Sequence, residues 1–450
     1  MWCKLESRGS GFEINGPLGD REIMLTRRRF LGTVGAGLVG VPCAAELARA
    51  AEPAATPRKR LAVVTTEWRY RSHAWHMAER FLVGYPINGR WHRPPLDVVA
   101  AYVDQKPEKD LSRSRSAEFG FPIYPSIAET LRCGGDKLAV DAVLIIGEHG
   151  DYPKSEFEQT KYPRYEFFKQ VTDVFRKDGR TTPVFNDKHL SWNWEWAKEM
   201  ADISHELNFA FTAGSSLAVT WRMPSIDMPY GADVEEMLCV ALGSVDSYDF
   251  HALEVIQCMA ERRRGGETGV IALQALRGDA VWKAMESGTW AGGGWDPRLF
   301  EACLSRSHTL AQPETFSHRY PSPAQMREWV KNPVAYRFEY ADGAKATMLL
   351  MNGLVSDFTF AARLKGQAEP ISSQFHLPTS PNIAYSAALM SKAEETFMTG
   401  KSPYPIERTL LTTGLVEAGV RSLGTGQKRL ETPHLAIRYQ VPRESTFARS

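Results

Sequence analysis

A lysine and a histidine, each next to an expected secondary-structure element, are the side chains best suited to catalysis. Lys188 follows the apolar run 183–185, which predicts a short strand, so its ammonium group lies at the carboxyl end of that strand. In a partly desolvated crevice such a group polarises a substrate hydroxyl and helps to lower its pKa. His251 and Glu254 are three residues apart on an expected helix, so the carboxylate can orient the imidazole as an acid–base group. The alternatives are a solvated loop lysine and a histidine that only packs in the core.

Residues 66–72, between the first expected strand and the first expected helix, carry groups suited to binding an anion. Arg69 and Arg71 supply charge-assisted hydrogen bonds to phosphate, and Ser72 caps a helix whose N-terminus favours negative charge. A dinucleotide-binding loop normally reads G-x-G-x-x-G, yet this loop has no glycine, and Glu67 would repel a pyrophosphate. Phosphate contacts are therefore expected from side chains rather than from a glycine-rich backbone.

Two further side chains are expected at the same crevice. Asp104 follows the second long strand and is a candidate for the acid that binds a nucleotide's ribose, although it lies farther downstream than the usual ~20 residues. His149 lies just past the carboxyl end of another strand and is expected to line the crevice. The remaining histidines and the cysteines show no spacing typical of metal ligands, so no metal is predicted.

Short strands and helices alternate from residue 61 to residue 214. Continuous apolar, β-branched runs predict buried parallel strands, and apolar residues at helical spacing predict helices between them. The strands are expected at 61–66, 96–103, 121–124, 140–146, 183–185 and 209–212, with helices starting near Ser72, Ser126, Glu166 and Trp194. This order predicts an α/β fold with a Rossmann-like, doubly wound parallel sheet and a ligand crevice at the carboxyl ends of its strands.

The second half of the chain predicts a C-terminal α+β domain with a largely antiparallel sheet. Strands are expected at 234–242, 269–273 and 357–364, and a hairpin with an Asp-Gly turn is expected over 336–351. A helix over 408–423 is expected to brace this sheet. The expected domains are a Rossmann-like nucleotide-binding domain over 58–215 and a substrate and oligomerisation domain over 216–450.

This layout resembles the glucose–fructose oxidoreductase, inositol dehydrogenase and MocA-like (Gfo/Idh/MocA) family. The segment 119–131 (FGFPIYPSIAETL), the strand 141–146 and the segment 183–191 (PVFNDKHLS) carry the likeness, the last standing where the family has its Glu-Lys-Pro motif. By this resemblance Lys188 fits the lysine that contacts both substrate hydroxyl and nicotinamide. His251 and Glu254 fit the histidine and the trailing acid of the family's Asp-x-Gly-x-His-x-x-Asp segment.

The resemblance implies an NAD(P)-dependent oxidoreductase that acts on a sugar or polyol hydroxyl, with NAD or NADP as cofactor. Two alternatives stay open. One is a glycosidase on the same fold that uses tightly held NAD for transient oxidation. The other is a cofactor-free carbohydrate-binding or scaffold protein, a pseudoenzyme, which the missing glycines favour.

The first fifty residues resemble an export signal of the twin-arginine (Tat) type. The cluster 26–29 (TRRR) precedes the uncharged run 31–45, and Ala48-Arg49-Ala50 supplies a small-x-small cleavage site. Met24 is an alternative start. Because the Tat route carries folded proteins, we expect a periplasmic or extracellular protein that is loaded with its cofactor before export, and no membrane association once the signal is removed.

The charge and cysteine content of the chain limit the kinds of partner and scaffold that we expect. With 54 Lys+Arg against 53 Asp+Glu, the net charge is +1, which argues against a nucleic-acid-binding surface. Six cysteines in 450 residues are too few for a disulfide scaffold. The expected partner is a small sugar or polyol, and the exposed sheet face common in this fold class predicts a homo-oligomer.

Overall fold

The computed structural model describes residues 57–377 and 385–449. The chain from Pro57 onward forms one compact unit, so the strands and helices expected in both halves of the sequence are described together. The export signal predicted over residues 1–50 lies outside the described residues.

A parallel sheet forms the first layer, as predicted, and it has five strands rather than the six expected. Its order is β4 (Leu96–Val103), β1 (Lys59–Thr65), β5 (Ala142–Ile146), β6 (Val184–Asp187) and β7 (Phe211–Gly214). The middle strand β5 is buried over its whole length, as its continuous apolar run predicted. The order reverses between β1 and β5, so a ligand crevice is expected at the carboxyl ends of these strands.

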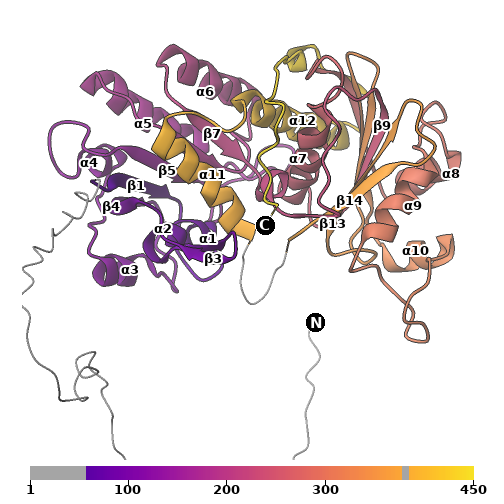
Figure 1. The fold of residues 1–450 in the computed structure, drawn as a ribbon, viewed down its shortest axis with the longest axis horizontal. Helices are drawn as coiled ribbons and strands as arrows, with labels where there is room; N and C mark the ends of the chain where they lie inside the picture. The colour runs from indigo at the N-terminus through magenta and orange to yellow at the C-terminus, as the bar shows by residue number, and fades with distance from the viewer. Residues whose placement is uncertain (1–56, 378–384, 450) are drawn as a thin grey trace, which may run out of the picture. The chain divides into compact units, whose positions relative to one another are not determined.

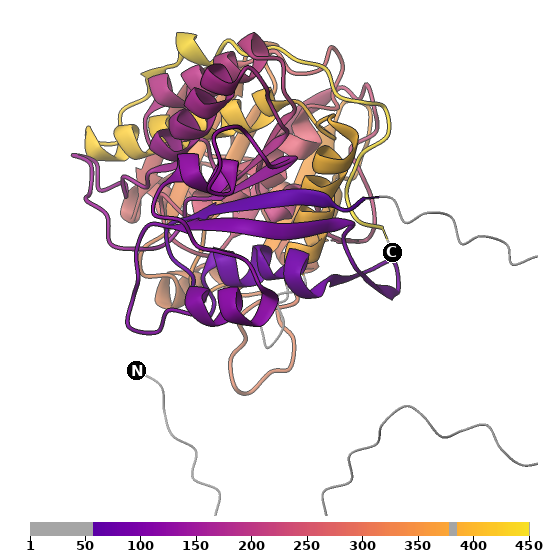
Figure 2. The ribbon, with the colours of Figure 1, turned by 90° about the vertical axis from the view of Figure 1, so that its left-hand side faces the viewer.

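Helices cover both faces of this sheet (Figures 1 and 2), which confirms the doubly wound arrangement. One face packs against α4 (Ile127–Arg132), α5 (Arg164–Asp178) and α6 (Trp194–Glu206). The other face packs against α1 (His73–Met77), α2 (Glu79–Val83) and α11 (Tyr385–Thr399). Helix α11 comes from the C-terminal part of the chain, and its contribution to this layer was not predicted.

Three details of the first half differ from the sequence prediction. The segment 121–124, expected to be a strand, makes only an isolated bridge between Ile123 and Ala101. Helix α3 (Ser112–Phe119) was not predicted because it has almost no apolar face: Ser112 is its only buried residue. The insertion before β4 forms a small hairpin of β2 (Tyr85–Ile87) and β3 (Arg90–His92).

The second half forms an eight-stranded, mostly antiparallel sheet, as predicted. Its order is β15 (Leu430–Glu431), β10 (Val270–Arg277), β11 (Val334–Tyr340), β12 (Lys345–Leu350), β9 (Val234–Ala241), β13 (Phe358–Leu364), β14 (Ile371–Phe375) and β8 (Arg222–Met223). Only β9 and β12 pair in parallel. The Asp342-Gly343 turn joins β11 to β12, which confirms the predicted hairpin.

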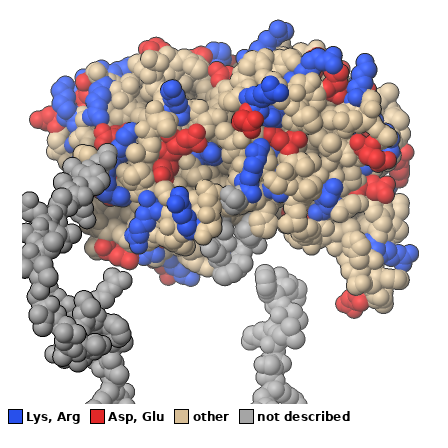
Figure 3. All heavy atoms as spheres, viewed as in Figure 1, with Lys and Arg blue, Asp and Glu red and all other residues tan. Residues whose placement is uncertain are grey.

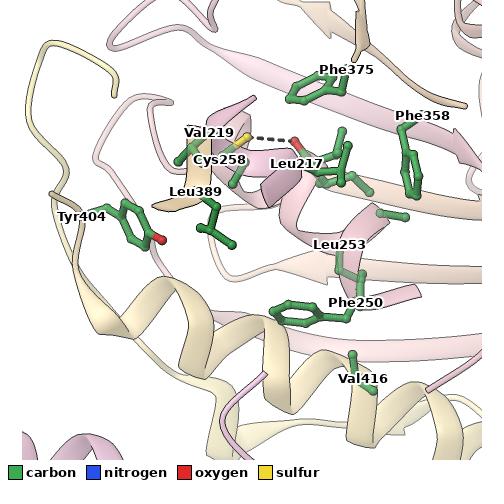
Figure 4. Close-up of a cluster of buried hydrophobic side chains, with 14 of the residues drawn as sticks. Leu217, Val219, Phe250, Leu253, Cys258, Phe358, Phe375, Leu389, Tyr404 and Val416 are labelled. Carbon is green, nitrogen blue, oxygen red and sulfur yellow. Dashed lines mark hydrogen bonds between the residues drawn. The ribbon is translucent and has the colours of Figure 1, made fainter. Parts of the chain in front are cut away.

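Helices also cover the two faces of this second sheet. The outer face packs against α8 (Asp279–Ser287), α9 (Pro297–Arg306) and α10 (Pro323–Trp329). The inner face packs against α7 (Tyr248–Ala260) and α12 (Ile406–Gly424), and α12 also contacts α6 and β7 of the first layer. Figure 4 shows the buried apolar side chains around α7. Two short 3-10 helices, η1 (Ser216–Val219) and η2 (Pro433–Leu435), complete the described elements.

Helix α12 approaches its neighbours closely because it carries small residues. A Cβ atom added at Gly419 would lie 2.2 Å from Cε2 of Tyr336, a fully buried side chain on β11. We therefore expect Gly419→Ala to lower the free energy of unfolding by about 1–3 kcal/mol through overpacking. Urea unfolding measures the change, and Arg421→Ala, on the exposed face of the same helix, is the control expected to stay within about 0.5 kcal/mol of wild type. Equal stability of Gly419→Ala and wild type would contradict this packing.

The face of the molecule seen in Figure 3 carries interspersed positive and negative side chains. No helix among residues 57–377 and 385–449 is long and apolar enough to cross a membrane. Cys133, Cys239, Cys258 and Cys303 are free thiols, and the last three are buried.

Candidate functional site

Polar side chains from both layers gather at the carboxyl edge of the parallel sheet. They come from α1, from the residues that follow β5 and β6, from the start of η1, and from α7. The described residues in this group are His73, His76, Glu148, His149, Asp187, Lys188, Ser215 and His251. Only His149, Lys188 and His251 among them were selected as site residues from the sequence.

Lys188 lies immediately after β6 and is almost completely buried, with 3% of its surface exposed. Its Nζ donates a hydrogen bond of 3.2 Å to the backbone carbonyl of Ser247, just before α7, and lies 3.6 Å from Oε1 of Glu148. The ring of Tyr248 lies 5.9 Å from the same ammonium group. The lysine is therefore a buried, paired cation, and the alternative of a solvated loop lysine is wrong.

The backbone at this edge is held in an uncommon conformation at two of the polar residues. Lys188 has φ of +67° and His149, after β5, has φ of +72°. Side chains other than glycine rarely adopt this left-handed region, and residues held there are concentrated at functional sites. The conformation supports a functional role for both loops.

Glu148 joins Lys188 to a second buried cation, Arg164, which starts α5. The Glu148 carboxylate forms an ion pair with Arg164 and faces Lys188 on its other oxygen. Burial alone would raise the pKa of Glu148, but Lys188 and Arg164 together hold its pKa well below the ordinary range. Glu148 therefore stays ionised and keeps the ammonium group of Lys188 in place.

His73 and Asp187 form a hydrogen-bonded pair at the same edge of the sheet. Nδ1 of His73, the first residue of α1, lies 2.5 Å from Oδ2 of Asp187, the last residue of β6. Asp187 is 1% exposed, so the carboxylate faces the imidazole away from bulk water. Such a hydrogen bond fixes the tautomer and leaves Nε2 as the nitrogen that exchanges a proton with a ligand.

Two more imidazoles contact His73. Its ring centroid lies 4.7 Å from that of His76 and 5.0 Å from that of His149. Burial, followed by the charge of His73, lowers the pKa of His149 to about 4 and that of His76 well below the ordinary value. Nδ1 of His76 and Nε2 of His149 are buried without a hydrogen-bond partner in the described structure. No group of three His, Cys, Asp or Glu side chains among the described residues is arranged as a metal site.

His251 reaches the same edge of the sheet from α7. Its Nδ1 lies 2.6 Å from the Ser215 hydroxyl, at the start of η1. Burial, followed by the nearby charges of Lys188 and His73, lowers the pKa of His251 well below its ordinary value, so the imidazole is neutral near pH 7. His251 therefore shares this edge of the sheet with Lys188 and His73.

Glu254 lies one turn after His251, but Ser215 rather than Glu254 is the hydrogen-bond partner of the imidazole. The carboxylate accepts a hydrogen bond of 2.6 Å from the Thr412 hydroxyl and one of 3.4 Å from the Ser215 backbone N–H. Glu254 thus positions Ser215, and Ser215 positions His251. The sequence placed Glu254 on the right face of the helix and missed Ser215, which lies 36 residues from His251 along the chain.

Burial raises the pKa of the fully buried Glu254 to about 7 from an ordinary value of 4.5, against the opposing effects of Arg408, Thr412 and Ser215. Between these two values the folded protein holds a proton that the unfolded chain has lost, so the contribution of Glu254 to stability falls as pH rises from 4.5 to about 7. We expect the stability of wild type minus that of Glu254→Gln to fall by about 3 kcal/mol between pH 4 and pH 8. Urea unfolding at a series of pH values measures it. A difference that does not change with pH would contradict the raised pKa.

The residues predicted to hold a nucleotide have other partners in the loop after β1. Nε of Arg69 forms an ion pair of 2.6 Å with the buried carboxylate of Glu67. The Ser72 hydroxyl accepts hydrogen bonds from the backbone N–H groups of Arg69 and Trp75, and so caps α1. The Arg71 guanidinium lies 5.7 Å from the ring of Tyr70.

Asp104 lies after β4, at the far side of the sheet from Lys188. It is exposed, and its two carboxylate oxygens accept hydrogen bonds from the Tyr102 and Tyr152 hydroxyls, at 2.7 and 2.6 Å. The fold thus brings three of the predicted site residues, His149, Lys188 and His251, to one edge of the sheet, and Glu254 contacts Ser215, the partner of His251. The predicted nucleotide-binding residues lie elsewhere: Arg69, Arg71 and Ser72 are in the loop after β1, and Asp104 follows β4.

This loop does not fit the pyrophosphate of a dinucleotide. Close approach of a pyrophosphate requires small residues and free backbone N–H groups at a helix N-terminus. Here the fully buried Trp68 and the buried carboxylate of Glu67 occupy the loop, and α1 has only five residues. The Arg69 charge is already paired with Glu67.

No protein-family model and no curated protein sequence matches this chain. Among solved structures, the GenD2 protein of gentamicin A biosynthesis, solved in complex with NAD, is similar over 84% of this chain and 97% of its own, with 12% identity and a TM-score of 0.52. The myo-inositol 2-dehydrogenase of Lactobacillus plantarum matches over 83% of this chain and 99% of its own, with 11% identity and a TM-score of 0.49. The similarity to GenD2 supports the Rossmann-like fold described above.

Proposed function

We propose that this protein is an oxidoreductase-like enzyme that acts on a sugar or polyol, at a carbon bearing a hydroxyl or carbonyl group. One observation carries the proposal: a buried, paired lysine lies beside neutral imidazoles at the carboxyl edge of a doubly wound sheet. Buried titratable groups with shifted pKa values in one crevice are characteristic of catalytic sites.

In the proposed reaction Lys188 binds the reacting oxygen of the substrate. Glu148 and the Ser247 carbonyl fix its ammonium group, and a third N–H bond remains for a ligand. A hydrogen bond from a buried cation stabilises negative charge that develops on this oxygen. The neutral imidazole of His251, oriented by Ser215, exchanges the substrate proton.

Electrostatics favour an uncharged, hydroxyl-rich substrate. While the imidazoles are neutral, the carboxylates of Glu148 and Asp187 balance the cations Lys188 and Arg164, so this edge of the sheet then holds no surplus of either charge. The unpartnered nitrogens of His76 and His149 supply further hydrogen-bonding groups to hydroxyls. Sugars and polyols meet both conditions.

Hydride transfer with NAD or NADP is the second candidate. The similarity to GenD2 and the place of Lys188 after β6 favour it, and the loop after β1 opposes it. An NAD-using glycosidase would need the same cofactor. A cofactor-free carbohydrate-binding protein would need only the crevice.

A turnover screen tests the proposal. Polyols, aldoses, ketoses and glycosides are incubated with the purified protein, with and without added NAD and NADP, and products are identified by mass spectrometry and NMR. We expect conversion of one sugar or polyol class. Binding without conversion would identify a carbohydrate-binding protein, glycoside cleavage would identify the glycosidase, and neither binding nor conversion would overturn the proposal.

We further propose that the protein is exported by the Tat route to the periplasm or beyond. We also propose that residues 58–215 act as the nucleotide-binding domain, that residues 216–450 act as the substrate and oligomerisation domain, and that the protein assembles as a homo-oligomer. Cell fractionation of the full chain, compared with a variant in which Arg27 and Arg28 are both changed to lysine, tests the export proposal, because the paired arginines carry the predicted signal.

A further inference from the structure

We propose that His73, oriented by Asp187, is a second acid–base group of this site, and that with His251 it epimerises an α-hydroxy carbonyl compound such as a keto sugar. This inference rests on the proposed function and deepens it. The reaction it names is redox-neutral, which agrees with a first loop that does not fit a dinucleotide.

The two imidazoles reach this edge from different strands of the sheet. The strands lie in the order β1, β5, β6, β7. His73 starts α1, which follows β1, and it contacts Asp187 at the end of β6 from the β1 side. His251 is held by Ser215, which follows β7, and so enters from the other side. Lys188, directly after β6, lies between the two flanks. Two acid–base groups on either side of one cation are what inversion at a carbon next to a carbonyl requires.

The surroundings of the two imidazoles suit them to opposite roles in proton transfer. His251 is neutral near pH 7 because burial disfavours its charged form, so it is suited to accept a proton. When His73 carries its second proton, the adjacent Asp187 carboxylate compensates the positive charge. In the proposed step His251 is therefore the base, and His73 beside Asp187 is the acid.

The reaction balances without a co-reactant. The C–H bond next to the carbonyl breaks, and its proton goes to Nε2 of His251. The electron pair moves into the carbonyl group, giving an enolate whose oxygen accepts a hydrogen bond from Lys188. His73 then gives its proton to the same carbon from the other side, so the product has the formula of the substrate and the opposite configuration. Proton exchange with water restores both histidines.

In this scheme Asp187 is a positioning residue, because it acts through His73. The side chain of Asn has the same shape as that of Asp but cannot compensate an imidazolium charge. We expect Asp187→Asn to lower kcat per folded protein tenfold or more with KM within about twofold of wild type. Urea unfolding of the same preparations gives the folded fraction, so that a loss of folding is not mistaken for a loss of kcat.

Deuterium wash-in tests the proposal. The protein is incubated in D₂O with D-fructose, D-tagatose or 2-keto-myo-inositol, and NMR follows deuterium at the carbon next to the carbonyl and the appearance of the epimer. We expect wild type to do both with at least one probe. His73→Asn should lower epimer formation about 10²–10⁴-fold, while wash-in continues from the isomer whose proton His251 removes.

Controls and contrary outcomes separate this inference from the proposed function. His205→Gln and Asp97→Asn, at exposed positions outside the crevice, should match wild type in both assays. Stoichiometric NAD or NADP released on denaturation, or turnover only with added nucleotide, would overturn the redox-neutral reaction. Either result would still agree with the proposed function, an enzyme that acts on a sugar or polyol. Absence of wash-in with all three probes would overturn the epimerisation. Absence of any turnover in the broader screen as well would overturn both proposals.

Discussion

Replacing Lys188 with methionine is expected to lower kcat for the sugar or polyol substrate by about 10²–10⁴, because in the proposed reaction the ammonium group of Lys188 binds the reacting oxygen. The protein should still fold. Glu148 keeps its ion pair with Arg164 after the ammonium group is lost, so no buried carboxylate is left without a cation. Methionine fills a similar volume with an unbranched side chain.

Steady-state kinetics and thermal unfolding of the same preparations test this prediction. Lys198→Met is the matched control, since Lys198 is an exposed residue of α6 whose partner is Asp202. The control should keep wild-type kcat. If Lys188→Met turned over substrate at the wild-type rate, Lys188 would have no catalytic role and the proposed site would be wrong.

Replacing Arg408 with methionine is expected to cause the largest loss of stability, about 3–5 kcal/mol. Arg408, on α12, is buried and donates two hydrogen bonds to the buried carboxylate of Glu261, of 2.9 Å from Nε and 2.5 Å from Nη2. The substitution leaves Glu261 with the Tyr439 hydroxyl and no cation to compensate its charge. Removing one partner of a buried ion pair lowers the free energy of unfolding far more than replacing both partners does.

The double variant Arg408→Met, Glu261→Gln is the control for this interpretation. It carries no unpaired buried charge, so we expect it to recover most of the stability lost in Arg408→Met. Urea unfolding of wild type, both single variants and the double variant gives the coupling energy. Additive effects of the two substitutions would show that the ion pair does not stabilise α12.

Most of the fold follows from local sequence patterns. The run 142–146 is apolar at every position and forms the buried strand β5, and Ser72 and Ser126 cap the helices predicted to follow them. Local patterns failed where burial was partial: α3 has almost no apolar face, and the apolar residues at 121–124 make only an isolated bridge. Helix α11 follows helical spacing, but nothing local indicates that it packs on the first sheet.

The site was predicted less completely, because its contacts join residues far apart in sequence. His73 and Asp187 are 114 positions apart, and Ser215 and His251 are 36 apart. One signal was available: Glu148, His149, Asp187 and Lys188 all lie at or just past the ends of predicted parallel strands, and those ends share one edge of the sheet. His73 and His76 in the first helix appeared scattered along the sequence, and the fold brings them to the same edge.

Histidine side-chain NMR is the most direct measurement of the central claim, that the edge formed by Lys188, His73 and His251 binds and acts on a sugar or polyol. Protein labelled with ¹⁵N in its histidines is titrated with the sugars and polyols of the turnover screen, and the imidazole signals are assigned by single substitutions. The account predicts saturable shifts of His73 and His251 with at least one member of the series, which Lys188→Met weakens at least tenfold and Lys198→Met leaves unchanged. Shifts confined to histidines outside the crevice, such as His205 or His434, or no shifts with any member, would contradict it.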